Sequence, residues 1–154
     1  MFKSLVRIIS TFFYTGYFPL IPGTAGSLAG ILVYFLVKNN PLVYILTLVT
    51  LLVLGFLASE EAEKLMGKKD PPCVVIDEVC GMLLGLLFVA YNIKLVIIAF
   101  FIFRVLDTLK PYPIGRLERL KGSLGMMMDD IVAGLYTNII LQGVVVLTLF
   151  FPPK

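Results

Sequence analysis

The fold is decided by residues 79–103, VCGMLLGLLFVAYNIKLVIIAFFIF, an apolar stretch interrupted only by Asn92 and Lys94. It could form one membrane-spanning helix with a lysine near its centre, or a hairpin of two shorter helices that turns at Asn92. A lysine in the middle of a bilayer costs about 2.5 kcal/mol or more. An asparagine close to that lysine is also a favourable turn residue. The stretch therefore predicts the hairpin.

The rest of the chain has the composition of a membrane protein. Of its 154 residues, 59% are hydrophobic and 15% charged, with a mean hydropathy of +0.98. Soluble domains carry about 25% charged residues, so much of this apolar surface must face lipid. Further apolar runs cover residues 27–37, 42–58 and 131–151, and the last is long enough to span a bilayer. We expect one all-α domain over residues 1–154, a polytopic membrane bundle with short transmembrane or re-entrant helices.

The first residues predict a different kind of helix. Residues 5–14 are apolar but interrupted by Arg7, with Lys3 just ahead of them. This pattern indicates an N-terminal amphipathic helix that lies on the membrane surface with its basic side chains near head groups.

The hairpin determines which charges share a side of the membrane. It places the N-terminus and residues 59–78 and 104–130 on one side, together with all ten acidic residues of the chain. The bases on that side are Lys3, Arg7, Lys64, Lys68, Lys69, Arg104, Lys110, Arg116, Arg119 and Lys121, whereas Lys38, Lys94 and Lys154 fall on the other. The excess of bases predicts that the acidic side is cytoplasmic. A net charge of +3 is too small to indicate a nucleic-acid partner.

Two acidic pairs stand at the start of apolar runs, Asp77-Glu78 and Asp129-Asp130. Helix capping would account for one acid of each pair. It does not account for adjacent carboxylates, twice, on helices that enter a membrane, because a buried carboxylate needs a partner or a metal. Clustered carboxylates suit Mg²⁺. A small residue follows each pair by about one turn, Gly81 and Ala133, which would let a neighbouring helix approach closely.

Residues 104–113, RVLDTLKPYP, place charges three apart. Arg104 and Asp107 share a helical face, and Lys110 follows before the prolines end the helix. Basic residues that reach up to lipid head groups would explain Arg104 and Lys110 but would leave Asp107 as a salt-bridge partner only. Alternatively, Asp107 is a metal ligand or a base, and the two cations hold phosphate oxygens.

Residues 22–27, PGTAGS, precede the first apolar run. Glycines with Thr24 and Ser27 at a helix N-terminus form an anion site from backbone N–H groups and hydroxyls. A plain turn with a Ser or Thr cap is the alternative. The chain has no histidine, which excludes catalytic triads, metal sites and general bases that use this residue.

These segments together resemble the bacterial phosphatidylglycerophosphatase A family. The similarity comprises residues 22–27, 75–81, 103–114 and 125–134, which occur in the order of the family. It implies a mainly helical enzyme of the bacterial inner membrane, multi-pass, with its active site facing the cytoplasm. The implied reaction is the Mg²⁺-dependent hydrolysis of phosphatidylglycerol phosphate to phosphatidylglycerol and phosphate, in phospholipid biosynthesis.

The resemblance also implies a set of site residues. The expected metal ligands are Asp77, Glu78, Asp107, Asp129 and Asp130. The expected catalytic residues are Asp107, Asp130, Asp129 and Glu78. The substrate phosphate is expected near Arg104, Lys110, Thr24 and Ser27. Either water or an aspartate could attack phosphorus first.

Two other functions are compatible with parts of the sequence. A cation transporter would use acids as an ion pathway, but the long apolar runs contain no acids between their ends. A structural membrane protein would use acids only as caps and bases only as anchors, and the repeated acidic pairs argue against it.

Overall fold

The computed structural model describes residues 2–150, and over these residues the chain is helical with no strand. The helices are α1 (Phe2–Ser10), the 3₁₀ helix η1 (Thr15–Tyr17), α2 (Pro22–Val37), α3 (Pro41–Met66), α4 (Ile76–Leu86), α5 (Ile93–Leu109), α6 (Ile114–Leu117) and α7 (Ser123–Phe150). The predicted all-α fold is confirmed. Phe151 and Lys154, which the sequence assigns to the last apolar run and to the far side, lie outside the described residues.

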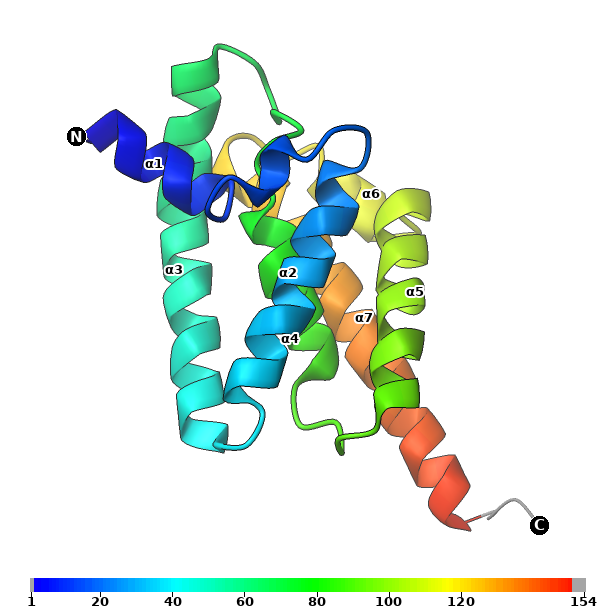
Figure 1. Ribbon diagram of the computed structural model, residues 1–154. Coiled ribbons are helices and arrows are strands. Elements are labelled where there is room, and N and C mark those ends of the chain that lie inside the picture. The colour runs from blue at the N-terminus through cyan, green and yellow to red at the C-terminus, as the bar shows by residue number, and fades with distance from the viewer. Residues whose placement is uncertain (1, 151–154) are drawn as a thin grey trace.

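The stretch that decides the fold forms a hairpin. Helix α4 ends at Leu86 and α5 begins at Ile93. Asn92 is the N-cap of α5, and its side chain accepts a hydrogen bond of 2.9 Å from the backbone N–H of Lys94. This geometry explains why the chain turns there. Figure 1 shows the turn at the end of the bundle opposite to the start of α4 and the end of α5.

A second hairpin joins α2 to α3 at the same far end. Asn40 caps α3 by accepting hydrogen bonds from Leu42 and Val43. The Lys38 ammonium lies 4.0 Å from the centroid of the Tyr91 ring and so connects the two turns. The two hairpins together bring residues 59–78 and 104–130 to the opposite end (Figure 1). We call that opposite end, which carries the acidic residues, the acidic end.

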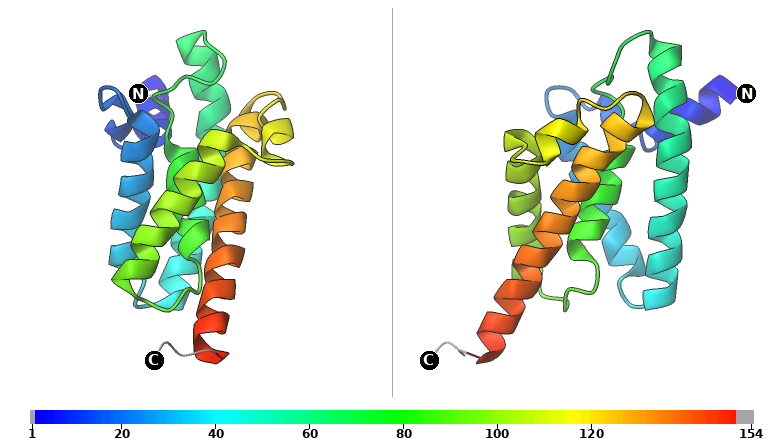
Figure 2. Two further views of the ribbon diagram at one scale, coloured as in Figure 1. Left: turned by 90° about the vertical axis from the view of Figure 1, so that its right-hand side faces the viewer. Right: turned by 180° about the vertical axis from the view of Figure 1, so that it is seen from behind.

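Helix α4 lies at the centre of the bundle. Of its eleven residues, all but Glu78 are buried. The views in Figures 1 and 2 show α2, α3, α5 and α7 around it. At 1.5 Å per residue α4 is about 17 Å long, roughly half the hydrocarbon thickness of a bilayer. It matches the short helices that the sequence predicts, and protein rather than lipid surrounds it.

The C-terminus of α4 is buried, and polar side chains of other helices satisfy its carbonyl groups. The Tyr44 hydroxyl donates a hydrogen bond of 2.6 Å to the carbonyl of Leu83. The Asn138 amide donates to the carbonyls of Gly85 and Leu87, at 3.2 and 2.7 Å. The last carbonyls of any helix lack partners within the helix. Side chains from α3 and α7 therefore allow α4 to end inside the bundle.

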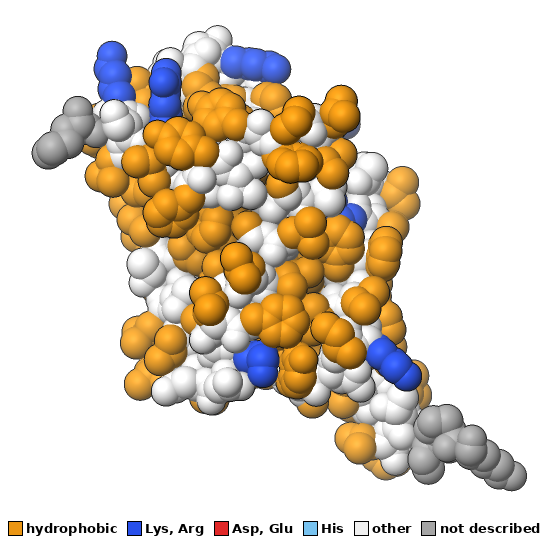
Figure 3. All heavy atoms as spheres, in the orientation of Figure 1, with side chains coloured by type: hydrophobic (Ala, Val, Ile, Leu, Met, Phe, Trp, Pro, Cys, Tyr) orange, Lys and Arg blue, Asp and Glu red, His pale blue; other side chains and the backbone are white. Residues whose placement is uncertain are grey.

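The outer surface is mainly apolar. Two of the described helices, α3 and α7, are long and apolar enough to cross a membrane. In Figure 3 hydrophobic side chains dominate the visible face, with lysine and arginine side chains mostly toward its ends. On α1, Phe2 and Leu5 are exposed while Val6 and Ser10 are buried against the bundle, as expected for an amphipathic surface helix.

Replacing Asn138 with leucine should destabilise the fold. The carbonyls of Gly85 and Leu87 would lose their strongest donor, and a buried unsatisfied group costs about 1–3 kcal/mol. We expect a lower midpoint of thermal unfolding in detergent for Asn138→Leu. The matched control is Thr148→Val, because within residues 2–150 the exposed Thr148 hydroxyl donates to the carbonyl of Val145 in its own helix. Equal midpoints for the wild type and Asn138→Leu would contradict this account of α4.

Candidate active site

The two acidic pairs meet because α4 and α7 cross at glycines. A Cβ placed on Gly81 would lie 2.7 Å from the carbonyl oxygen of Asp130. A Cβ placed on Gly134 would collide with the carbonyl oxygen of Gly81. Any larger residue at either position would force the helices apart. The close approach expected at Gly81 is confirmed, Gly134 lies at the same contact, and the neighbouring Ala133 is fully buried.

Each pair has the same local geometry. Asp77 accepts a hydrogen bond of 3.0 Å from the backbone N–H of Glu78, and Asp129 accepts one of 3.0 Å from that of Asp130. The pairs differ in their place on the helix. Asp77 and Glu78 stand in the first turn of α4, but no acid stands in the first turn of α7, which begins at Ser123. Helix capping therefore does not explain Asp129 and Asp130.

Three carboxylates form a group that could hold a metal ion. One carboxylate oxygen from each of Asp77, Glu78 and Asp130 lies within 4.8 Å of the others. Asp77 and Asp130 are 6% and 4% exposed. Glu78 Oε2 and Asp130 Oδ1 are buried and have no hydrogen-bond partner among the described residues. A bound cation would offset the repulsion between buried carboxylates and would pair with the two oxygens that have no donor, so these side chains fit a metal.

The other two expected ligands, Asp107 and Asp129, are paired with cations in the same site. Arg104 Nη1 donates to Asp107 Oδ2 at 2.6 Å, so the predicted contact along one helical face is present. Lys110 lies just beyond the end of α5, with a φ of +45°, and its ammonium donates to Asp129 Oδ2 at 2.9 Å. The prediction that these two aspartates bind the metal themselves remains a prediction.

Lys110 stays charged in this partly buried place. Burial lowers the pKa of its ammonium, but hydrogen bonds to Glu118 and Asp129 outweigh burial and raise the pKa above its ordinary value. Both bonds are 2.9 Å long. Lys110 is therefore a permanent cation at the acidic end.

Apart from Glu118, these side chains line one open cavity of about 350 Å³. The walls come from α2, α4, α5 and α7 and from the loop before α4. The expected site residues on them are Thr24, Asp77, Glu78, Arg104, Asp107, Lys110, Asp129 and Asp130. Ser27 is not among them: it is buried, and its hydroxyl donates to the carbonyl of Gly23 at 2.9 Å.

The start of α2 faces the carboxylates across this cavity. The sequence places residues 22–27 ahead of the helix, but α2 already begins at Pro22, and that expectation is wrong. The fixed φ of proline suits the first helical position, which explains the early start. Neither Thr24 nor Ser27 is therefore a helix cap. The first N–H groups of a helix have no partners within it, so those of Gly23 and Thr24 are available to an anion in the cavity.

Gly23 allows α2 to approach the acids. A Cβ at this position would lie 2.5 Å from Glu78 Oε1 and 3.1 Å from Arg104 Nη1. A side chain here would occupy the space between a carboxylate and a guanidinium that both face the cavity. Gly23 is thus needed for the geometry of the site.

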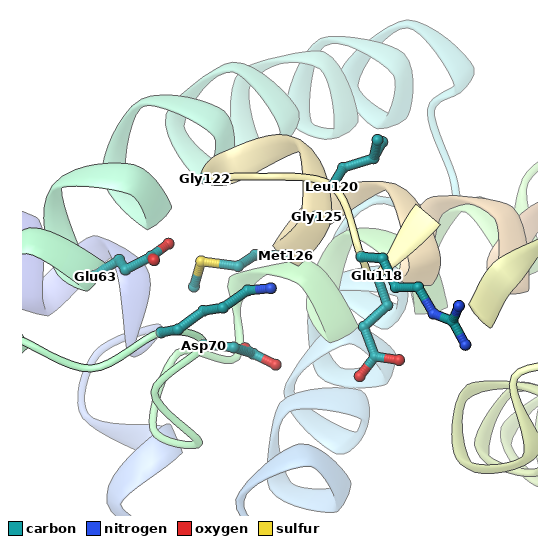
Figure 4. Close-up of a pocket in the computed structure, with 9 residues that line it drawn as sticks. Glu63, Asp70, Glu118, Leu120, Gly122, Gly125 and Met126 are labelled. Carbon is teal, nitrogen blue, oxygen red and sulfur yellow. The ribbon is translucent and has the colours of Figure 1, made fainter. Parts of the chain in front are cut away.

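Glu118 was missed by the reasoning from sequence. It follows Lys110 by eight residues with α6 in between, a spacing that has no helical meaning. It also lines a second cavity, of about 310 Å³, which shares Asp70 and Met126 with the first. Figure 4 shows Glu63, Asp70 and Glu118 around this second cavity. The ion pairs from Glu118 through Lys110 to Asp129 link the residues of the two cavities.

Comparison with known proteins gives this site a context. A family model described as phosphatidylglycerophosphatase A matches residues 8–145. The chain belongs to the phosphatidylglycerophosphatase A family. It is therefore a phosphatase, and its apolar helices are those of a membrane-associated protein.

Three curated relatives match most of the chain. A protein of Bacteroides thetaiotaomicron named putative phosphatidylinositol-3-phosphatase is 39% identical over 87% of this chain and 89% of its own length. The phosphatidylglycerophosphatase A of Escherichia coli is 37% identical over 83% and 76%, respectively. That of Haemophilus influenzae is 31% identical over 90% and 88%. No solved structure shows a significant match.

Replacing Gly23 with alanine should reduce phosphatase activity by at least about tenfold. The added Cβ would displace Glu78 or Arg104, and displacements of about 1 Å in an active site cost up to about 100-fold in rate. The matched control is Gly143→Ala, since a Cβ there meets no atom within 4 Å. Both variants should unfold at about the wild-type temperature, because alanine favours the helix. Full activity of folded Gly23→Ala would contradict the close packing at Gly23.

Proposed function

We propose that this phosphatase hydrolyses the terminal phosphate of phosphatidylglycerol phosphate in phospholipid biosynthesis, with Mg²⁺ as its cofactor. The observation that carries the proposal is the single cavity in which buried carboxylates, two cations and the start of α2 meet. The printed names of the relatives from E. coli and H. influenzae support the substrate.

The cations and the start of α2 would hold the phosphate. Arg104 and Lys110 line the cavity and are both partly buried, with side chains 24% and 25% exposed. Partial burial strengthens their attraction for a phosphate dianion. Asp107 and Asp129 fix the directions of these two cations, while the N–H groups of Gly23 and Thr24 would contact the phosphate from the opposite wall. Ser27 would act only by supporting the first turn of α2.

Asp77, Glu78 and Asp130 would hold the magnesium ion. When bound, Mg²⁺ would offset the charge of phosphate and carboxylates and lower the pKa of a nearby water. Asp107 lines the cavity outside this group of three, and we propose it as the acceptor of the proton of the attacking water. Arg104 would then offset charge on the phosphoryl oxygens in the transition state.

The substrate is a membrane lipid, and we propose that the acidic end faces the cytoplasm of a bacterial inner membrane that the chain crosses several times. Ten of the thirteen basic residues belong to the N-terminal segment and to residues 59–78 and 104–130, which the hairpins place at the acidic end. The other three belong to segments assigned to the opposite side. This asymmetry follows the rule for loops that stay in the cytoplasm. The lipid would keep its acyl chains in the cytoplasmic leaflet while its phosphate enters the cavity.

Phosphatidylinositol 3-phosphate is the competing substrate. The relative from B. thetaiotaomicron carries the name of a phosphatase for that lipid and is 39% identical to this chain. Both lipids present a phosphomonoester at the end of a polar head group. They differ in the head group that carries the phosphate, which is glycerol in one lipid and inositol in the other and which stays on the lipid after hydrolysis. Comparing the two lipids in one assay therefore separates the alternatives.

Purified protein in mixed micelles should release phosphate from phosphatidylglycerol phosphate faster than from phosphatidylinositol 3-phosphate. A chelator should abolish release, and Mg²⁺ should restore it. Asp130→Asn should reduce release by more than about 100-fold, because even outer residues of metal sites cost about 10–100-fold. The control is Glu61→Gln, a partly exposed acid at the same end whose salt bridge, within residues 2–150, is to Lys64.

The outcomes separate the proposal from its rivals. Faster phosphate release from the inositol lipid would show that phosphatidylinositol 3-phosphate is the preferred substrate. Phosphate release that persists in the presence of a chelator would contradict the proposed role of Mg²⁺. Cation flux into liposomes without phosphate release would favour a transporter. A fully active Asp130→Asn would contradict the role of the acidic group.

A further inference from the structure

The segment between α1 and α2 exposes large apolar side chains at the acidic end. Residues 11–21 read TFFYTGYFPLI. Phe13, Tyr14, Tyr17 and Phe18 are each more than half exposed, and Leu20 is 98% exposed. Tyrosines and exposed apolar groups beside a basic surface helix are typical of the boundary between lipid and water.

Leu20 combines this exposure with an unfavourable backbone. Its φ is +78°, in the left-handed region that favours glycine. Within residues 2–150 no side chain covers Leu20. A leucine that is both strained and exposed gains no stability from these contacts, which points to a contact with a ligand outside the protein.

The same leucine is part of the active-site cavity. Leu20 and Ile21 line it together with Arg104 and Asp107. Two other apolar lining residues, Val74 and Met126, are buried. Leu20 and Ile21 are therefore the exposed large apolar side chains of a rim that also carries Asp70, Pro72 and Thr24.

We propose that Leu20 and Ile21 bind the acyl-chain end of the lipid whose phosphate occupies the cavity. This inference rests on the proposed function and adds the place at which the lipid enters. The occupant is a lipid because the rim continues into the apolar outer surface. Leu28 on α2 and Val105 and Leu109 on α5 are more than half exposed.

The charges around the rim agree with this direction of entry. Arg104 lines the cavity near the start of α2, as shown by its closeness to Gly23. The second cavity, on the side of Glu118 and Arg119, carries exposed charges instead of exposed apolar side chains apart from Leu120. An acyl chain thus finds apolar contacts on the Leu20 side, and water and released phosphate find polar contacts on the other.

The test compares two substrates with one head group. Long-chain phosphatidylglycerol phosphate in vesicles presents acyl chains, and the dihexanoyl form is used as soluble monomers. Leu20→Gly keeps the backbone, because glycine adopts a positive φ freely, and removes the side chain. We expect the ratio of kcat/KM for the long-chain over the short-chain substrate to fall about tenfold, the effect of losing a small apolar contact in a binding site. Leu20→Met keeps a large apolar side chain at this position, so its ratio should stay close to that of the wild type.

Phe88→Gly is the matched control. Phe88 is 68% exposed with a φ of +56°, but it lies in the turn between α4 and α5 at the far end. Its ratio should equal that of the wild type. A ratio unchanged in Leu20→Gly, or lowered equally in Phe88→Gly, would overturn the inference. A wild type inactive toward both substrates would overturn the proposed function and the inference with it, whereas an active wild type with an unchanged ratio overturns the inference alone.

Discussion

The crossing of α4 and α7 at Gly81 and Gly134 positions the rest of the site. Two backbones can come this close only where neither helix carries a side chain. At that separation the acidic pair at the start of α4 reaches Asp130 of α7, and the three carboxylates share a volume small enough for one ion. The ion pairs of Asp107 and Asp129 surround this group. A wider crossing would leave the same residues at the same end without a common ligand set.

The crossing buries several carboxylates close together, and the surrounding structure compensates for part of this charge. Asp107 and Asp129 have cations within hydrogen-bond distance. The group of three has no such partners, and two of its oxygens are buried without donors in the described part of the chain. The site thus has two sets of acids. Asp107 and Asp129 orient the side chains of basic residues, whereas the group of three has no basic partner within residues 2–150 and could hold a metal ion. Under the proposed function, the same division would let one cavity accept both a metal and a phosphate.

The fold could be predicted from the sequence largely because one turn decided it. Asn92 beside Lys94 identified the hairpin, and the hairpin brought residues far apart in sequence to one end. The acidic pairs were recognisable because adjacent carboxylates beside apolar runs are rare. The exact set of three carboxylates was not predictable, because it depends on side-chain directions across two helices. Nor was the bond from Lys110 to Glu118, which a turn and a short helix create, or the start of α2 at Pro22, where apolarity alone suggested a later one.

The capped end of α4 has a consequence for how the molecule is assembled. Asn138 donates to the carbonyls of Gly85 and Leu87, and it lies on the last helix of the described chain. Domains begin to form from the N-terminus during synthesis. Until α7 arrives, α4 has unsatisfied carbonyls at one end and only two of the three clustered carboxylates, Asp77 and Glu78, at the other. Completion of the candidate active site is therefore a late event in synthesis, because a chain arrested before α7 would lack Asp129 and Asp130.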